Sequence, residues 1–280
     1  MNKLLVIGAT GSIGIQVVKQ AIDRGITTRA LVRNIESARE IMPATTEIFL
    51  GDATDPAILD QAIKDIDGII LTHSAHRPEA AIEAVDYGVV KYLLRALAGR
   101  KVHIVLMTSF GVTAPEQLQN KELGILDWKR RSERLLRQSG QIYTIVRPGW
   151  FDYNDDDERS IVFLQGDPLR SGTPQAGRIA RDQIARVLID SLFIKEARYK
   201  TLELISEYGE EQQDLRELFV RLLTDSPNSI DGVLDPDTLP LKNEPRRVQE
   251  DLLSIVNSSN PIQSSKNMHY VSKYMNINMK

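Results

Sequence analysis

The sequence predicts an α/β fold in which a doubly wound parallel sheet carries helices on both faces. Short apolar runs alternate with helical patterns over the first two thirds of the chain, and such alternation requires crossover connections between parallel strands. The first run enters a glycine-spaced turn that opens a helix. Hydrophobic residues make up 42% of the 280 positions, enough for a large buried core. From about residue 150 the alternation weakens, and we expect a small C-terminal cap region there.

The expected strands are short apolar runs, as in sheets that are buried on both faces. They lie at Lys3–Ile7, Thr28–Val32, Glu47–Leu50, Gly68–Thr72, His103–Met107, Tyr143–Val146 and Thr201–Ile205. Helical spacing of apolar residues is found at Ser12–Arg24, Pro56–Lys64, Glu79–Ala98, Glu122–Gln138, Asp182–Phe193, Asp214–Leu223 and Arg247–Val256. We therefore expect a main domain over residues 1–205, with insertions toward a substrate cleft from about residue 150. Residues 206–256 would form a helical extension and 257–280 a flexible tail.

Composition argues against several classes of protein. The formal net charge is −3 and basic residues are spread along the chain, which disfavours a nucleic-acid surface. No stretch is long and apolar enough to span a membrane, and the apolar N-terminal run is too short for a secretory signal. The chain has no cysteine, which excludes thiol chemistry and fits a reducing compartment. We expect a cytoplasmic protein whose partner is a small-molecule substrate, and the sequence gives no signal for its oligomeric state.

The glycine-spaced turn predicts a dinucleotide site. Gly8 lets the chain leave the strand in a tight turn, Gly11 lets a pyrophosphate approach the backbone, and Gly14 lets the following helix pack closely on the sheet. The first amides of that helix would then point at the phosphate oxygens. The alternative is an ordinary strand-turn-helix corner. The predicted cofactor-binding residues of this turn are Gly8, Thr10, Gly11, Ser12, Ile13 and Gly14.

The residue after the second strand distinguishes the two nicotinamide dinucleotides. A carboxylate there accepts the adenine-ribose 2′-hydroxyl, whereas an arginine accommodates a 2′-phosphate. This chain has Arg33 and no carboxylate at that point, so NADP(H) is favoured and NAD(H) remains possible. Arg29 is a weaker candidate because it lies inside the strand, and Arg33 could also be a solvated loop arginine.

The segment Gly51-Asp52-Ala53 follows the third strand. Asp52 could accept a hydrogen bond from the adenine amino group, with Ala53 beside it. The alternative is an acid that caps the helix beginning at Pro56, a role that Asp55 fits better.

Taken together, these residues resemble the atypical short-chain dehydrogenases/reductases, specifically the NmrA-like NAD(P)-binding family. The resemblance spans residues 1–205 and also includes Tyr143-Thr144-Ile145-Val146-Arg147-Pro148-Gly149-Trp150. It implies a Rossmann-type NAD(P)-binding domain. It further implies that Thr72, His73 and Ser74 lie along the cofactor, that Ser109 faces the nicotinamide, and that Pro148 and Gly149 flank its carboxamide.

The chain departs from this family at the catalytic helix. Catalytic members carry a tyrosine and, four residues later, a lysine that holds the nicotinamide ribose and lowers the tyrosine pKa. Here the tyrosine position is Ile125 and the lysine is Lys129. The spacing of Ile125, Lys129, Ser132 and Leu136 predicts an inward stripe, with Arg130 and Arg131 turned outward. Lys129 could bind ribose hydroxyls or simply cover apolar surface.

Ile125 cannot donate a proton, so carbonyl reduction by the family route would lose a factor of roughly 10²–10⁴ in rate. Hydride transfer to a flavin or quinone makes weaker demands on a protein acid. Tyr153, Asp152 and His73 are possible substitute acids, and Trp150 and Phe151 could line a substrate pocket.

Three functions compete on these grounds. The first is an NADP(H)-binding oxidoreductase that passes hydride to a quinone, flavin or carbonyl, with Lys129 and Ser109 as catalytic candidates. The second is a non-catalytic NAD(P)-binding redox sensor of NmrA type. The third, a nucleotide-sugar epimerase or dehydratase, normally needs the missing tyrosine. No metal site is predicted, because His73 and His76 lack a third ligand nearby.

Overall fold

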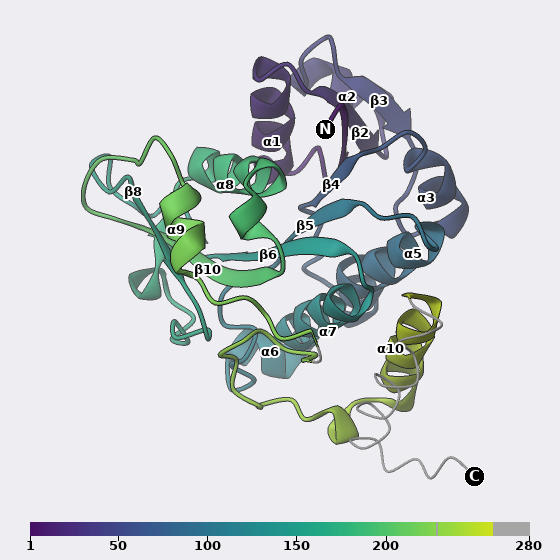
Figure 1. The fold of residues 1–280 in the computed structure, drawn as a ribbon, viewed down its shortest axis with the longest axis vertical. Coiled ribbons are helices and arrows are strands. Elements are labelled where there is room, and N and C mark those ends of the chain that lie inside the picture. The colour runs from purple at the N-terminus through teal and green to yellow at the C-terminus, as the bar shows by residue number, and fades with distance from the viewer. Residues whose placement is uncertain (228, 260–280) are drawn as a thin grey trace.

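The computed structural model describes residues 1–227 and 229–259, and it forms a sheet covered by helices on both faces (Figure 1). Within these residues the main sheet has eight strands in the order β3-β2-β1-β4-β5-β6-β10-β8. Seven are parallel, and β8 pairs antiparallel with β10. The strands are β1 (Lys3–Ile7), β2 (Thr27–Val32), β3 (Glu47–Leu50), β4 (Gly68–Leu71), β5 (His103–Met107), β6 (Ile142–Pro148), β8 (Ser160–Leu164) and β10 (Lys200–Glu207). The predicted doubly wound sheet is confirmed.

Alternate residues of each strand face two separate cores. Leu4 and Val6 of β1 pack toward α1 (Ser12–Asp23) and α8 (Arg181–Phe193). Leu5 and Ile7 face the opposite core, which α3, α5, α7 and α10 cover. The bounds of the helices on that second face are α3 (Pro56–Ala62), α4 (Glu79–Ile82), α5 (Val89–Ala96), α6 (Leu118–Leu123), α7 (Ile125–Gln138) and α10 (Arg246–Ser259).

Several elements differ from the sequence prediction. The helix expected over Glu79–Ala98 is interrupted by a π-helical segment, η1 (Glu83–Gly88). The helix expected over Glu122–Gln138 is divided at Gly124, whose φ of 62° ends α6 before α7 begins. The elements that were not predicted include β8 and α2 (Ile35–Ile41). Helix α2 is capped by Asn34, whose side chain accepts a hydrogen bond from the Ser37 amide at 2.9 Å.

The remaining elements are short. A two-stranded sheet joins β7 (Trp150–Phe151) to β9 (Arg178–Ile179), and α9 (Arg216–Arg221) follows β10. Single 3-10 turns are found at η2 (Pro174–Ala176), η3 (Lys195–Ala197) and η4 (Leu241–Asn243). No helix in the described ranges has both the length and the apolar character needed to cross a bilayer.

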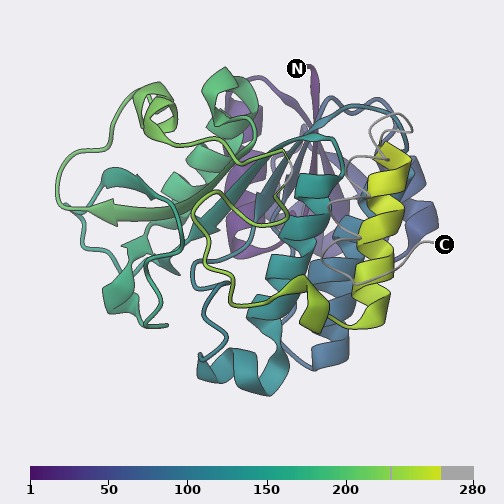
Figure 2. The same cartoon turned by 60° about the horizontal axis from the view of Figure 1, so that its bottom comes forward.

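The chain beyond β10 returns along the second face of the sheet. Its last described helix, α10, lies beside α7 and α5 (Figure 2). Of the predicted tail over 257–280, residues 257–259 belong to α10 and the rest lies outside the described residues. The domain boundaries given above therefore stay predictions.

The prediction that Arg130 turns outward from α7 is wrong. Its side chain is 1% exposed and binds Asp231 at 2.9 Å, with Thr238 and the Pro236 carbonyl as further acceptors. Arg131, also expected outward, is half-buried against Glu244 at 2.7 Å. Both acceptor groups come from the segment that follows β10, so the charged face of α7 is covered by chain about 100 residues away.

The buried charges continue into the sheet at Arg147 on β6. Its guanidinium is fully buried and binds Glu133 at 2.6 Å, Asp235 at 2.7 Å and Glu203 at 2.9 Å. Burial is the largest influence on Glu203 and raises the pKa of its carboxyl to about 7, although Arg147 opposes it. The second carboxyl oxygen of Glu203 has no hydrogen-bond partner within the described structure.

This raised pKa predicts a pH dependence of stability. Between about pH 4.5 and 7 folded Glu203 holds a proton that the unfolded chain has released, so the free energy of unfolding falls as pH rises through that window. Glu203→Gln has no titrating carboxyl at this position and should therefore lack this decrease in the free energy of unfolding. Relative to wild type, the variant should gain stability from pH 5 to pH 8, by at most about 3 kcal/mol. Urea denaturation at the two pH values measures this.

Glu207→Gln is the matched control, because Glu207 is exposed at the end of the same strand. Its stability relative to wild type should be the same at both pH values. A Glu203→Gln difference that does not change with pH would contradict the assignment of the buried proton.

Candidate functional site

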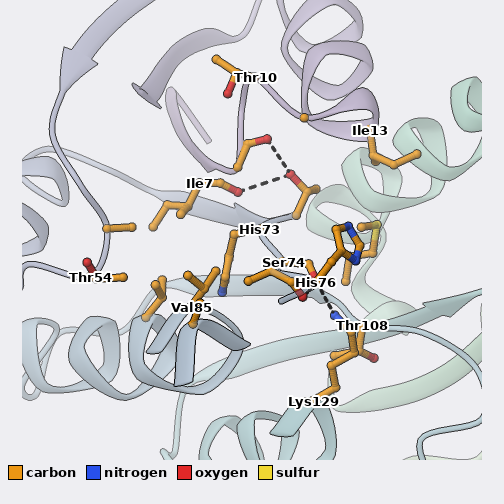
Figure 3. Close-up of a pocket in the computed structure, with 18 of the residues that line it drawn as sticks. Ile7, Thr10, Ile13, Thr54, His73, Ser74, His76, Val85, Thr108 and Lys129 are labelled. Carbon is orange, nitrogen blue, oxygen red and sulfur yellow. Dashed lines mark hydrogen bonds between the residues drawn. The ribbon is translucent and has the colours of Figure 1, made fainter. Parts of the chain in front are cut away.

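A cavity of about 810 Å³ opens at the carboxyl ends of the parallel strands (Figure 3). Its walls come from the loops after β1, β2, β3, β4 and β5, from the helical segment that contains Ala81, Val85 and Val89, from α7 and from Phe151 of β7. Strand order reverses between β1 and β4, which is the place where open α/β sheets bind ligands. The structure brings into this lining the predicted residues Gly8, Thr10, Gly11, Ser12, Ile13, Arg33, Asp52, Ala53, Thr72, His73, Ser74, Ser109 and Lys129.

The three glycines of the first turn have different structural roles. Gly8 has a φ of 88°, and a Cβ there would lie 2.5 Å from the His73 backbone nitrogen. A Cβ on Gly14 would lie 2.1 Å from the Gly8 carbonyl oxygen, so this glycine is needed for α1 to pack on the turn. Gly11 is exposed, and a Cβ there would come no closer than 3.2 Å to the same oxygen. Gly8 and Gly14 therefore serve the fold, whereas Gly11 keeps the cavity open.

The N-terminus of α1 faces the cavity. Gly11 is its N-cap and supplies no side chain to the first-turn amides, and Ser12 and Ile13 both line the cavity. The first amides of a helix have no partner within the helix and carry partial positive charge. This end of the cavity can bind an anionic diphosphate.

Arg33 and Asp52 lie at the adenine end predicted from the sequence. One oxygen of Asp52 accepts hydrogen bonds from the Thr54 amide at 2.9 Å and the Thr54 hydroxyl at 2.8 Å. The Thr54 amide, helped by the Thr54 hydroxyl and by the charge of Arg33, holds the pKa of the Asp52 carboxyl below its usual value. Asp55, and not Asp52, caps α3, and Asp52 lines the cavity.

Arg29, the weaker candidate, serves the sheet. Its guanidinium binds Glu47 at 2.6 Å and the Ala62 carbonyl at 2.7 Å, and it lies outside the cavity lining. Of the two arginines considered for the 2′-phosphate, Arg33 lines the cavity and Arg29 does not.

Lys129 is buried, and its partner in the structure is a carboxylate that the sequence did not reveal. Its ammonium lies 2.5 Å from Asp86 and 2.9 Å from the Ser74 hydroxyl. Of the predicted inward stripe, Lys129, Ser132 and Leu136 are buried and Ile125 is half-buried, but most of the other residues of α7 are buried too. Asp86 lies in η1, where the sequence pattern shows only a continuous helix.

The candidate acids are distributed unequally. His73 lines the cavity, and burial lowers its pKa to about 4, with Lys129 adding to the effect and Asp86 opposing it. The imidazole is therefore neutral at physiological pH, and its Nδ1 has no hydrogen-bond partner in the described part of the chain. Tyr153 is exposed and packs on Trp150, whereas Asp152 pairs with Arg181. Neither belongs to the lining.

Three of the predicted site residues lie outside the lining, namely Gly14, Pro148 and Gly149. Gly149 has a structural role, because a Cβ there would lie 2.5 Å from the Gly177 carbonyl oxygen. Pro148 ends β6, and its carbonyl accepts a hydrogen bond from Phe110 at 3.3 Å. The contact of Pro148 and Gly149 with the nicotinamide carboxamide stays a prediction. The described residues contain no cluster of three metal-ligating side chains, and the absence of a metal from the reaction stays a prediction as well.

The glycine geometry predicts separable effects on binding and folding. Gly11→Val places a side chain in the cavity while keeping an ordinary backbone conformation, so it should weaken NADPH binding by about tenfold or more with little loss of stability. Gly14→Ala should instead cost roughly 1–3 kcal/mol of stability through overpacking. Fluorescence titration with NADPH and thermal denaturation measure the two effects. Wild-type affinity in Gly11→Val would contradict the placement of the diphosphate.

Comparison with known proteins agrees with this geometry. Residues 8–195 match the model of a family described as NAD(P)H-binding. The chain is 32% identical over 248 residues to an uncharacterized chloroplastic protein of Arabidopsis thaliana, covering 79% of this chain and 75% of the relative. It is 30% identical over 260 residues to sanguinarine reductase of Eschscholzia californica, covering 78% of this chain and 93% of the relative.

A solved structure of an oxidoreductase from Lactococcus lactis shares the fold. Its TM-score is 0.61 at 16% identity, with 79% of this chain and 96% of that chain covered. The Rossmann-type fold implied by the resemblance is thus confirmed. From its match to the family model over most of its length, the chain belongs to the NAD(P)H-binding family.

Proposed function

We propose that the protein is an NADP(H)-dependent oxidoreductase of the atypical short-chain type, NmrA-like, that passes hydride between the nicotinamide and a small planar acceptor. The observation that carries the proposal is that one cavity is lined by the first turn, from Gly8 to Ile13, by Arg33 and by Lys129. Its place at the carboxyl ends of five strands fits an extended dinucleotide. The similarity to sanguinarine reductase, which covers most of the length of that relative, supports the proposal that this protein is a reductase.

The preference for NADP(H) rests on charge at the end of β2. Arg33 lines the cavity, and its guanidinium can form two charge-assisted hydrogen bonds to a 2′-phosphate. Asp52 lies near enough to interact electrostatically with Arg33, and the described chain has no carboxylate in the position directly after the strand, where a 2′-hydroxyl would need one.

The lining around Ile125 favours an acceptor that needs little help from a protein acid. Ile125, Met107 and Phe151 contribute apolar side chains to the lining, and the described lining contains no tyrosine. His73 is neutral, so it can form a hydrogen bond but does not deliver a ready proton. When bound, the reduced nicotinamide supplies a hydride. A quinone or flavin delocalises the resulting charge and can take its proton from water, whereas a simple carbonyl cannot delocalise it.

In this proposal Lys129 holds the ribose next to the nicotinamide and Ser109 donates a hydrogen bond at the reacting end. Both residues line the cavity, as does Ile125. A quinone or flavin is the preferred acceptor class, and a carbonyl compound is the less favoured one.

The second candidate function is a redox sensor that binds the cofactor without turnover. The observation that favours it is Ile125 at the position of the catalytic phenol. Such a sensor must bind the oxidised and reduced cofactors unequally, because a ligand with equal affinity for two states shifts nothing.

Location and partners stay predictions. A cysteine-free chain fits the cytoplasm or another reducing compartment, and the relative in Arabidopsis is named as chloroplastic. We expect a small-molecule partner and neither nucleic acid nor membrane.

The oxidoreductase predicts turnover in a simple assay. NADPH oxidation should be faster with at least one quinone or flavin than with any aldehyde tested, because only the former delocalise charge without a protein acid. Absorbance of NADPH in a panel of the three acceptor classes measures this. Tight NADPH binding with no turnover of any acceptor, and unequal NADP⁺ and NADPH affinities by calorimetry, would favour the sensor instead.

The cofactor assignment predicts a charge-reversal effect. Arg33→Asp should weaken NADPH binding by roughly 10- to 100-fold, since it replaces a charge-assisted contact with repulsion, and should leave NADH binding nearly unchanged. Arg39→Asp is the control, because Arg39 is an exposed arginine of α2 outside the cavity lining. An unchanged preference for NADPH in Arg33→Asp would overturn the assignment.

A further inference from the structure

The helix that borders the cavity contains a six-residue π-helical segment, η1, between α4 and α5. A π turn adds a residue to the helical turn and so redirects the side chains that it carries. Asp86 lies within this segment and is 3% exposed. A buried carboxylate requires partners, because an isolated charge in the interior is costly.

The partners of Asp86 come from two other walls of the cavity. One oxygen accepts hydrogen bonds from Lys129 at 2.5 Å and from the Ser74 hydroxyl at 2.9 Å. The other accepts the Ala75 amide at 2.9 Å. Lys129 also donates to Ser74 at 2.9 Å, a bond drawn in Figure 3. One carboxylate therefore joins η1, the loop after β4 and helix α7.

The residues next to Asp86 and Lys129 form a second contact between η1 and α7. Tyr87 follows Asp86, and Trp128 precedes Lys129; their rings lie 5.5 Å apart. The Tyr87 hydroxyl donates to Asp251 of α10 at 3.1 Å. Thus α10 lies on the outer side of α7 (Figure 2). The Asp86–Lys129 pair lies beside the cavity, because Lys129 and its other partner, Ser74, both line it.

We propose that Asp86 is a positioning residue of the dinucleotide site. Asp86 holds the ammonium of Lys129 and the segment Ser74–Ala75 in the arrangement that receives the ribose next to the nicotinamide. This proposal rests on the proposed function. Without the carboxylate, Lys129 would be a buried charge with no charged partner and would turn toward water. Ser74 and Ala75 would lose their shared acceptor at the same time.

The test is a double-mutant cycle on NADPH affinity, with Asp86→Asn, Lys129→Met and the two combined. Asparagine keeps the shape of Asp86 and removes its charge. Each single change should weaken NADPH binding by about tenfold. Because Asp86 acts through Lys129, the double variant should bind about as weakly as the weaker single variant, and not about a hundredfold more weakly than wild type.

Asp225→Asn is the matched control. Asp225 is another buried carboxylate that binds α7, through Arg137 at 3.3 Å, and it lies outside the cavity lining. The control should lower the melting temperature and leave NADPH affinity unchanged, which separates positioning from a general loss of stability.

If Asp86→Asn does not fold, Asp86→Glu provides the test, since it keeps a carboxylate but displaces it by one methylene from Lys129, Ser74 and Ala75. A drop of about threefold in NADPH affinity is expected. Wild-type affinity in a folded Asp86→Asn or in Asp86→Glu would overturn the proposal, as would independent, multiplying effects in the cycle. A wild-type protein that binds no NADPH would instead refute the proposed function, and this proposal with it.

Discussion

The close approach of the β1–α1 turn to the start of the loop after β4 is the constraint on which the site depends. A Cβ added at Gly8 would lie 2.5 Å from the His73 backbone nitrogen, so only glycine fits there. Gly14 lets α1 pack directly on Gly8. The Thr72 amide donates to the Ile7 carbonyl at 2.9 Å and fixes the two segments side by side. These backbone contacts aim the first amides of α1 into the cavity and carry His73 to its wall, so the geometry of the site follows from packing that only glycine permits.

Helix α7 places a second constraint on the opposite wall. Its basic residues are buried among carboxylates. Arg134, for example, binds both Asp231 and Glu244, each at 2.8 Å. Buried ion pairs add little net stability, but the loss of one partner is costly, so they determine where the segment after β10 docks. The same helix presents Ile125 and Lys129 to the cavity. The C-terminal part of the chain therefore supports the wall of a site to which it contributes no lining residue among those described.

Local patterns were enough to predict most of the sheet, the first turn and the inward place of Lys129. Period and glycine spacing are properties of a few neighbouring residues, and the predicted strands agree with the structure to within a few positions. Asp86 could not be found in this way, because an added residue in a helical turn leaves no mark on the apolar spacing of 79–98. Arg130 was misplaced since its partner Asp231 lies 101 residues away in sequence. Strand β8 was missed because it lies beyond residue 150, where the alternation of strand and helix patterns weakens.

The most direct test of the account is a crystal structure with NADP⁺ bound. The account places the diphosphate on the amides of Ser12 and Ile13, the 2′-phosphate at Arg33 and the nicotinamide ribose within hydrogen-bond distance of Lys129. A diphosphate bound elsewhere, or side chains that fill the crevice in front of α1 in the presence of saturating NADP⁺, would contradict it.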